Sequence, residues 1–154
     1  MQTFKKKSIQ FFATGGLIGF SPVAPGTLGS LTAMPLCLFV SLLATEVAVF
    51  FVVVLTLVST WIAHAAERMA SQNDPNEVVI DEMCGMVVTL FALPFTPVFI
   101  IGGFALFRVF DIFKPFPIGW IDQKISGGVG IMLDDVIAGL IANLLLRLGR
   151  YLIN

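Results

Sequence analysis

The sequence has little charge, a single histidine and two cysteines. Only 12% of its 154 residues are charged, against about 25% in ordinary soluble domains. Cys37 and Cys84 lie far apart within apolar runs, so with one histidine no zinc-binding spacing exists. A formal net charge of −1 without a basic stripe gives no indication of a nucleic-acid partner. These absences exclude a zinc protein and a nucleic-acid-binding domain.

Apolar residues make up 57% of the chain and concentrate in runs, which is typical of a small membrane protein. The runs are Leu28–Ala44, Glu46–Ala66, Met83–Phe107 and Ile131–Leu146, and the first two are expected to be spans that form a hairpin. The second run, at about 1.5 Å per residue, is about 31 Å long and would cross a hydrocarbon core of about 30 Å. The length leaves room for one domain, residues 1–154.

Pro94 and Pro97 interrupt the third run and predict a hairpin in place of one straight span. Proline removes a backbone donor and disfavours helix at the residue before it. Each arm reaches only about 16 Å, half a bilayer, so the hairpin returns Asp81 and Arg108 to the same face. The predicted fold is therefore all-α, a small polytopic membrane helical bundle with a re-entrant or short helical hairpin around Pro94–Pro97.

Basic residues indicate the orientation of this bundle. Three lysines, Lys5 to Lys7, precede the first run, and the hairpin brings Arg68, Arg108, Lys114 and Lys124 to their face. The positive-inside rule makes that face cytoplasmic. Arg147 and Arg150 either lie on the far side or return with a bent last helix. Phe4–Phe20 fits either a helix at the membrane interface or the first core helix.

The acidic residues are distributed unevenly. Two adjacent pairs, Asp81–Glu82 and Asp134–Asp135, each open an apolar run, and Asp111 stands between Arg108 and Lys114. An ionised carboxylate in apolar surroundings is costly unless it is paired or coordinates a cation. The pattern predicts an oxygen-ligand metal site, formed by the two pairs, beside an anion site. The alternatives are acids favoured by a helix dipole and a plain helical ion pair between Arg108 and Asp111.

Three polar features are weaker candidates. The segment Ser21–Ser30 contains two prolines and two glycines and cannot continue a helix; Thr27 could bind a phosphate, although capping of the next helix by Thr27 or Ser30 is the simpler interpretation. The glycine-rich turn Ser126–Gly130 leads directly to the second acidic pair. His64 either has its hydrogen-bond partners nearby at a helix end or donates a proton to a leaving group.

Four stretches resemble the phosphatidylglycerophosphatase A family, in the family's order and over nearly the whole chain. They are Ala13–Ser30, Val79–Met86, Phe107–Ile118 and Gly127–Gly139. The resemblance implies Mg²⁺-dependent hydrolysis of phosphatidylglycerophosphate, a phospholipid in the bilayer, to phosphatidylglycerol and phosphate at the cytoplasmic (inner) membrane. It also implies that Asp81, Glu82, Asp111, Asp134 and Asp135 are metal or catalytic carboxylates and that Arg108 and Lys114 are phosphate ligands.

Two other classes stay open. A small cation transporter would place its acids near the membrane midplane, whereas here they stand at helix ends beside basic residues. Another metal-dependent enzyme of phospholipid precursors, such as a phosphoalcohol transferase, would also use clustered aspartates, but the chain lacks a compact run of Asp-Gly pairs. Neither cysteine is followed six residues later by arginine, which excludes a cysteine-phosphatase loop. The nucleophile, water or aspartate, and the formation of a homo-oligomer are left open.

Overall fold

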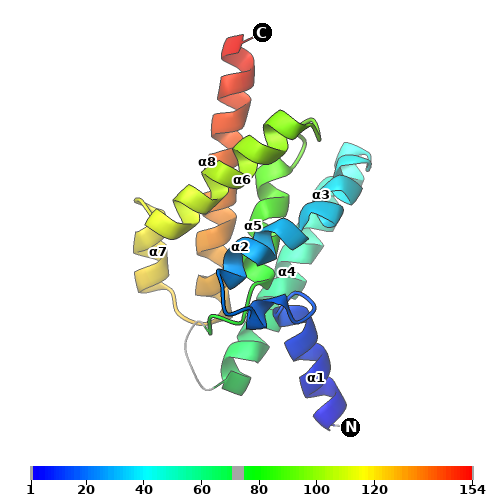
Figure 1. The fold of residues 1–154 in the computed structure, drawn as a ribbon, viewed down its shortest axis with the longest axis vertical. Helices are drawn as coiled ribbons and strands as arrows, with labels where there is room; N and C mark the ends of the chain where they lie inside the picture. The colour runs from blue at the N-terminus through cyan, green and yellow to red at the C-terminus, as the bar shows by residue number, and fades with distance from the viewer. Residues whose placement is uncertain (1, 71–74, 154) are drawn as a thin grey trace.

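The computed structural model describes residues 2–70 and 75–153, with side chains for residues 4–70 and 75–152. Within these ranges the secondary structure is helical and contains no strand, which confirms the predicted fold class (Figure 1). The elements are α1 (Gln2–Ala13), η1 (Ile18–Phe20), α2 (Pro25–Thr32), α3 (Met34–Ser41), α4 (Thr45–Ala70), α5 (Ile80–Leu90), α6 (Pro97–Phe113), α7 (Ile118–Lys124) and α8 (Gly128–Ile153).

Two helices, α4 and α8, are long and apolar enough to cross a membrane. The apolar segments span 26 residues in Thr45–Ala70 and 25 in Gly128–Leu152, or about 38 Å each at 1.5 Å per residue. Both predicted runs in these regions are confirmed. Since α8 is continuous, Arg147 and Arg150 lie near its far end, away from its acidic start (Figure 1). The alternative of a bent last helix is therefore wrong.

The first predicted apolar run, Leu28–Ala44, is not one span. It is divided between α2 and α3, which meet at Ala33, and Pro35 stands in the first turn of α3. Because proline supplies no backbone donor, the chain restarts a helix here instead of extending the first one. The combined segment Pro25–Ser41 is about 25 Å long even if straight, short of a hydrocarbon core of about 30 Å.

The prediction that Thr27 or Ser30 caps a helix is also wrong. Helix α2 follows Ala24, which has a left-handed backbone and gives no side-chain cap, and Pro25 occupies the first turn. Proline suits this position because its missing N–H would have no intrahelical acceptor there. The hydroxyl of Ser30 instead donates to the carbonyl of Gly26 within α2, at 2.9 Å.

Helices α5 and α6 form the predicted hairpin. Helix α5 ends at Leu90, Ala92 turns the chain in a left-handed conformation with φ 52°, and α6 begins at Pro97. The reversal brings Arg108 of α6 to 3.9 Å from Glu82 of α5, nitrogen to oxygen. A short helical hairpin around Pro94–Pro97 is therefore confirmed, and both polar clusters lie at the same end of it.

Helix α5 stands at the centre of the bundle (Figure 1) and packs most extensively against α8, with further contacts to α2, α3, α4 and α6. The core around it contains Met86 and Val87 of α5, Phe107 of α6 and Ala138 of α8. Helix α4, in contrast, leaves large apolar side chains such as Phe50 exposed. Such an apolar outer surface suits contact with lipid, because exposed apolar side chains are unfavourable in water but not among lipid tails.

Candidate active site

The two acidic pairs and two cations line one cavity at the starts of α5 and α8. The cavity has a volume of about 430 Å³. Its ionisable lining residues are Asp81, Glu82, Asp111, Asp134, Asp135, Arg108 and Lys114. Ile131 and residues from the segments 21–26 and 75–78 also line it. Segments distant in the sequence thus share one site, as the hairpin requires.

Three carboxylates in this cavity lie close enough to share an ion. Asp81, Glu82 and Asp135 each offer an oxygen, and these oxygens all lie within 4.8 Å of one another. Asp81 is 7% exposed and Asp135 is 3% exposed. Within the described part of the chain, Oε2 of Glu82 is buried with no hydrogen-bond partner. Clustered hard oxygens with unused acceptor capacity are the ligands that divalent cations take, so this carboxylate cluster could hold a metal ion.

Glycines allow the helices to bring these acids together. A Cβ on Gly139 of α8 would lie 2.5 Å from the carbonyl oxygen of Gly85 on α5, so the two backbones are in direct contact. On the other side of α5, a Cβ on Gly26 of α2 would collide with Oε1 of Glu82. The first turn of α2 therefore lies directly on this carboxylate, where the positive end of the helix dipole favours an anion.

Asp134, next to Asp135 in the chain, pairs with a lysine instead of joining the carboxylate cluster. Its Oδ2 accepts a hydrogen bond from Nζ of Lys114 at 2.6 Å, and Oδ1 of Asp122 accepts another at 2.6 Å. Burial alone would lower the pKa of Lys114, but the hydrogen bonds to Asp122 and Asp134 outweigh it and raise this pKa above its ordinary value. Lys114 therefore keeps its positive charge at the wall of the cavity.

The position of Lys114 depends on its backbone. It ends α6 in the left-handed region, with φ 42°, which is uncommon for a residue other than glycine. This turn lets the side chain reach both α7 and α8. Sequence reasoning missed Asp122, because two prolines between Lys114 and α7 interrupt the helix. No regular helical spacing therefore links the lysine to Asp122.

Arg108 is held by residues from three helices. Its Nη1 lies 2.5 Å from Oδ2 of Asp111 and 3.9 Å from Oε1 of Glu82, and it donates to Oγ of Ser30 at 3.4 Å. Its Nε is buried and, among the described residues, has no hydrogen-bond partner. A guanidinium carries five donors, so Arg108 retains a donor for a bound anion. Asp111 thus contacts Arg108 and is not one of the three clustered carboxylates.

Two candidates from the sequence lie outside this cavity. Thr27 is half-buried within α2 and is not among the lining residues described. His64, on α4, lies 3.7 Å from Glu67 and borders a separate pocket with Lys5 and Arg68. The geometry gives no support to a phosphate contact by Thr27 or to a proton-donor role for His64, and both stay predictions.

The fold and the site define a class: a helical membrane protein with a buried acidic cluster and two cations in one cavity at the helix ends. The chain belongs to the phosphatidylglycerophosphatase A family, whose model matches residues 11–150. This confirms the resemblance drawn from the sequence and identifies the chain as a lipid phosphatase.

Three relatives cover most of the chain. Phosphatidylglycerophosphatase A of Escherichia coli strain K12 is 36% identical over 90% of this chain and 82% of its own length. A protein of the same name from Haemophilus influenzae is 37% identical over 87% of this chain and 83% of its own. A Bacteroides thetaiotaomicron protein, provisionally named a phosphatidylinositol-3-phosphatase, is 39% identical over 91% of this chain and 92% of its own length. No solved structure gives a significant match.

Proposed function

We propose that this chain, as a single membrane-embedded domain, hydrolyses the terminal phosphomonoester of phosphatidylglycerophosphate to phosphatidylglycerol and phosphate. Its family and the names of two relatives support this substrate. The observation that carries the proposal is the cavity in which three clustered carboxylates stand beside Arg108 and Lys114. A cation transporter would have little use for two basic residues fixed in the same cavity.

The charges of the cavity favour a divalent cation as cofactor. Its lining holds five acids and two bases, a formal excess of three negative charges when all are ionised. Such an excess opposes a phosphomonoester, which is itself an anion, unless a cation offsets it. Magnesium fits the donor set, because it takes one or two carboxylates, keeps several waters and also binds a substrate phosphate. We assign Asp81, Glu82 and Asp135 to the ion.

The other charged residues bind and orient the phosphate. Arg108, fixed by Asp111, supplies a guanidinium in the cavity wall for the phosphoryl oxygens, and Lys114, fixed by Asp122 and Asp134, adds a second cation. When bound, magnesium supplies Lewis-acid stabilisation of the charge that develops on the phosphoryl group. In the net hydrolysis the bond between phosphorus and the glycerol oxygen breaks, water supplies the new oxygen on phosphorus, and one proton of that water ends on the glycerol oxygen.

The site lies where a lipid headgroup could reach it. The cavity is at the starts of α5 and α8, while α4 and α8 are the helices that could cross the membrane. We place this end at the cytoplasmic face of the inner membrane, since it carries basic residues: Lys5 to Lys7 within α1, Arg68 in the last turn of α4 and Lys124 at the end of α7. A cysteine label at Ser126, which is exposed, should react from that side only; labelling from the opposite side would contradict this orientation.

Phosphate release by the purified protein tests the activity. In mixed micelles with Mg²⁺, phosphatidylglycerophosphate should be turned over much faster than glycerol 3-phosphate, which lacks the acyl chains that deliver the lipid to the site. A chelator should abolish release, and Asp135→Asn serves as the inactive control. Equal turnover of the soluble ester, or turnover that survives the chelator, would show that the proposal is wrong.

The name of the Bacteroides relative supplies a second candidate substrate, phosphatidylinositol 3-phosphate. It is also a phosphomonoester on a phospholipid headgroup, so the same cations and carboxylates could act on it. The two lipids belong in the same assay, at equal surface concentration. Faster release from the inositol lipid would replace the proposed substrate and keep the proposed chemistry.

A further inference from the structure

Helices α5 and α8 run in parallel and meet in layers one helical turn apart. Asp81 lies with Asp135, Gly85 contacts Gly139, and Thr89 lies beside Asn143. Each step is four residues on both helices, about 6 Å of rise. The carboxylate cluster is therefore one end of a helix pair whose other end, about 12 Å away, is closed by Asn143.

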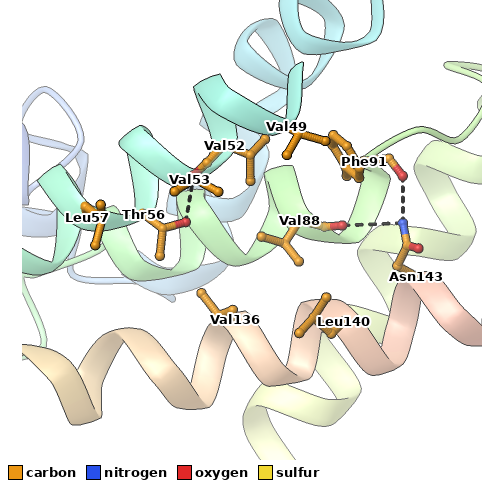
Figure 2. A pocket seen from close by; sticks show the side chains of 10 residues that line it. All are labelled: Val49, Val52, Val53, Thr56, Leu57, Val88, Phe91, Val136, Leu140 and Asn143. Carbon is orange, nitrogen blue, oxygen red and sulfur yellow. Dashed lines mark hydrogen bonds between the residues drawn. The ribbon is translucent and has the colours of Figure 1, made fainter. Parts of the chain in front are cut away.

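Asn143 and Arg147 of α8 bind the carbonyl end of α5. Nδ2 of Asn143 lies 2.9 Å from the carbonyl oxygens of both Thr89 and Phe91 and 3.4 Å from that of Val88. Figure 2 shows the amide of Asn143 facing the carbonyls of Val88 and Phe91. Nη2 of Arg147 donates to Phe91 at 3.0 Å and to Ala92 at 3.3 Å, and its Nε donates to Oδ1 of Asn143 at 2.7 Å.

These bonds lie where the backbone most needs them. The last carbonyls of a helix have no intrahelical donor, and α5 ends in the turn of a hairpin, beside the left-handed Ala92. The surroundings are apolar: a groove of about 320 Å³ is lined by Asn143 and by side chains such as Val49, Val53 and Leu140 (Figure 2). Carbonyls left unsatisfied in such surroundings are costly.

The glycine contact cannot fix the axial position of α5 by itself. Gly85 and Gly139 let the backbones touch, but neither glycine has a side chain that could interlock with the facing helix. The bonds from Asn143 link its side-chain amide on α8 to backbone carbonyls at the end of α5 and therefore oppose sliding along the helix axis. A shift of α5 by about 1 Å would move Asp81 and Glu82 against Asp135, and misplacement of that size has large effects in active sites.

We propose that Asn143, supported by Arg147, is a positioning residue for the carboxylate cluster: it fixes α5 on α8 so that Asp81, Glu82 and Asp135 can bind one cation. It touches neither substrate nor ion and acts through the axial position of α5. The inference rests on the proposed function only in taking the cluster as the metal site, and it holds whichever phospholipid is the substrate.

Binding of Mn²⁺ alone to the purified protein, followed by EPR without substrate, tests the inference. Carboxylate sites that suit magnesium also take manganese. Asn143→Leu keeps a side chain of similar size and removes the amide, so its Mn²⁺ dissociation constant should rise about 3- to 10-fold, the range expected for one or two lost interhelical bonds in a membrane. Asn143→Gln retains an amide and should restore part of the affinity.

The control is Thr60→Val, which also removes a side-chain hydrogen bond, but one that stays within α4. It should leave Mn²⁺ affinity unchanged. If Asn143→Leu fails to fold, Arg147→Gln takes its place with an expected rise of about 2- to 3-fold. A folded Asn143→Leu, or in its absence Arg147→Gln, with wild-type affinity would overturn the inference, and so would a wild-type protein that binds no Mn²⁺. Failure of the proposed function would appear separately, as absent phosphate release from a protein that does bind Mn²⁺.

Discussion

Asp134 and Asp135 are adjacent, carry the same group and are both buried, yet they face different partners. Asp135 lies with Asp81 and Glu82 in a cluster of three acids, whereas Asp134 accepts a hydrogen bond from Lys114. On a helix, neighbouring residues point about 100° apart, so one acidic pair serves two regions of the cavity. A bound cation would offset the repulsion among the three clustered acids, while Asp134 is already compensated by Lys114.

The largest expected effect comes from Asp135→Asn. The change removes one charge and one ligand from the cluster, so activity should fall more than about 100-fold, beyond the 10- to 100-fold typical of residues that only support ligands. Phosphate release from phosphatidylglycerophosphate at saturating Mg²⁺ measures it, with thermal unfolding in detergent as a check that the variant is folded. A folded variant with near wild-type turnover would remove Asp135 from the site.

A smaller effect, roughly 10-fold, is expected for Asp134→Asn, because it removes an acceptor of Lys114 but none of the three clustered carboxylates. The pH profile should separate this variant from Asp135→Asn. In the wild type the hydrogen bonds hold the pKa of Lys114 above its ordinary value. The stabilising effect of its charge is therefore complete below the ordinary pKa of about 10.4 and is lost as the pH rises from there through the raised pKa. Loss of Asp134 lowers this pKa, and the alkaline limb of activity should move to lower pH.

An unchanged alkaline limb in Asp134→Asn would contradict the role given to Lys114. Asp122→Asn is the matched comparison, since it removes the other acceptor of the same ammonium group but lies on α7, outside the residues that line the cavity. Both variants should shift the limb in the same direction.

The sequence predicted the hairpin because its cause is local. Pro94 and Pro97 stop a helix wherever they occur, and charge patterning required both polar clusters at one end. The same local reasoning indicated which acids would gather, since isolated carboxylates in apolar runs need a shared partner. The same reasoning failed for Leu28–Ala44. Hydrophobicity alone suggested one span there, but a single proline, Pro35, divides the segment into two helices.

Which acid joins the carboxylate cluster and which one pairs with Lys114 depends on how the helices are oriented, and the sequence alone does not show this. Whether Asp134 or Asp135 faces α5 is set by the rotation of α8, which follows from the contact of Gly139 with Gly85. Likewise Asn143 is one polar residue in an apolar run, and only the place where α5 ends gives it partners.

The smallest effects are expected at the two candidates outside the cavity. Thr27→Val and His64→Gln should each change turnover by less than about twofold, the range of substitutions away from any special contact. The same phosphate-release assay checks both, side by side with Asp134→Asn. A loss from His64→Gln as large as that from Asp134→Asn would restore the proton-donor hypothesis and extend the site toward α4.

The position of a bound ion tests the account most directly. Crystals grown with Mn²⁺ should show an anomalous scattering peak within about 2.5 Å of oxygens from Asp81, Glu82 and Asp135, with Asp134 still bound to Lys114. The peak should vanish in Asp135→Asn and persist in Asp134→Asn. A peak between Asp134 and Asp122, or a peak that survives in Asp135→Asn, would contradict the assignment of the cluster as the metal site.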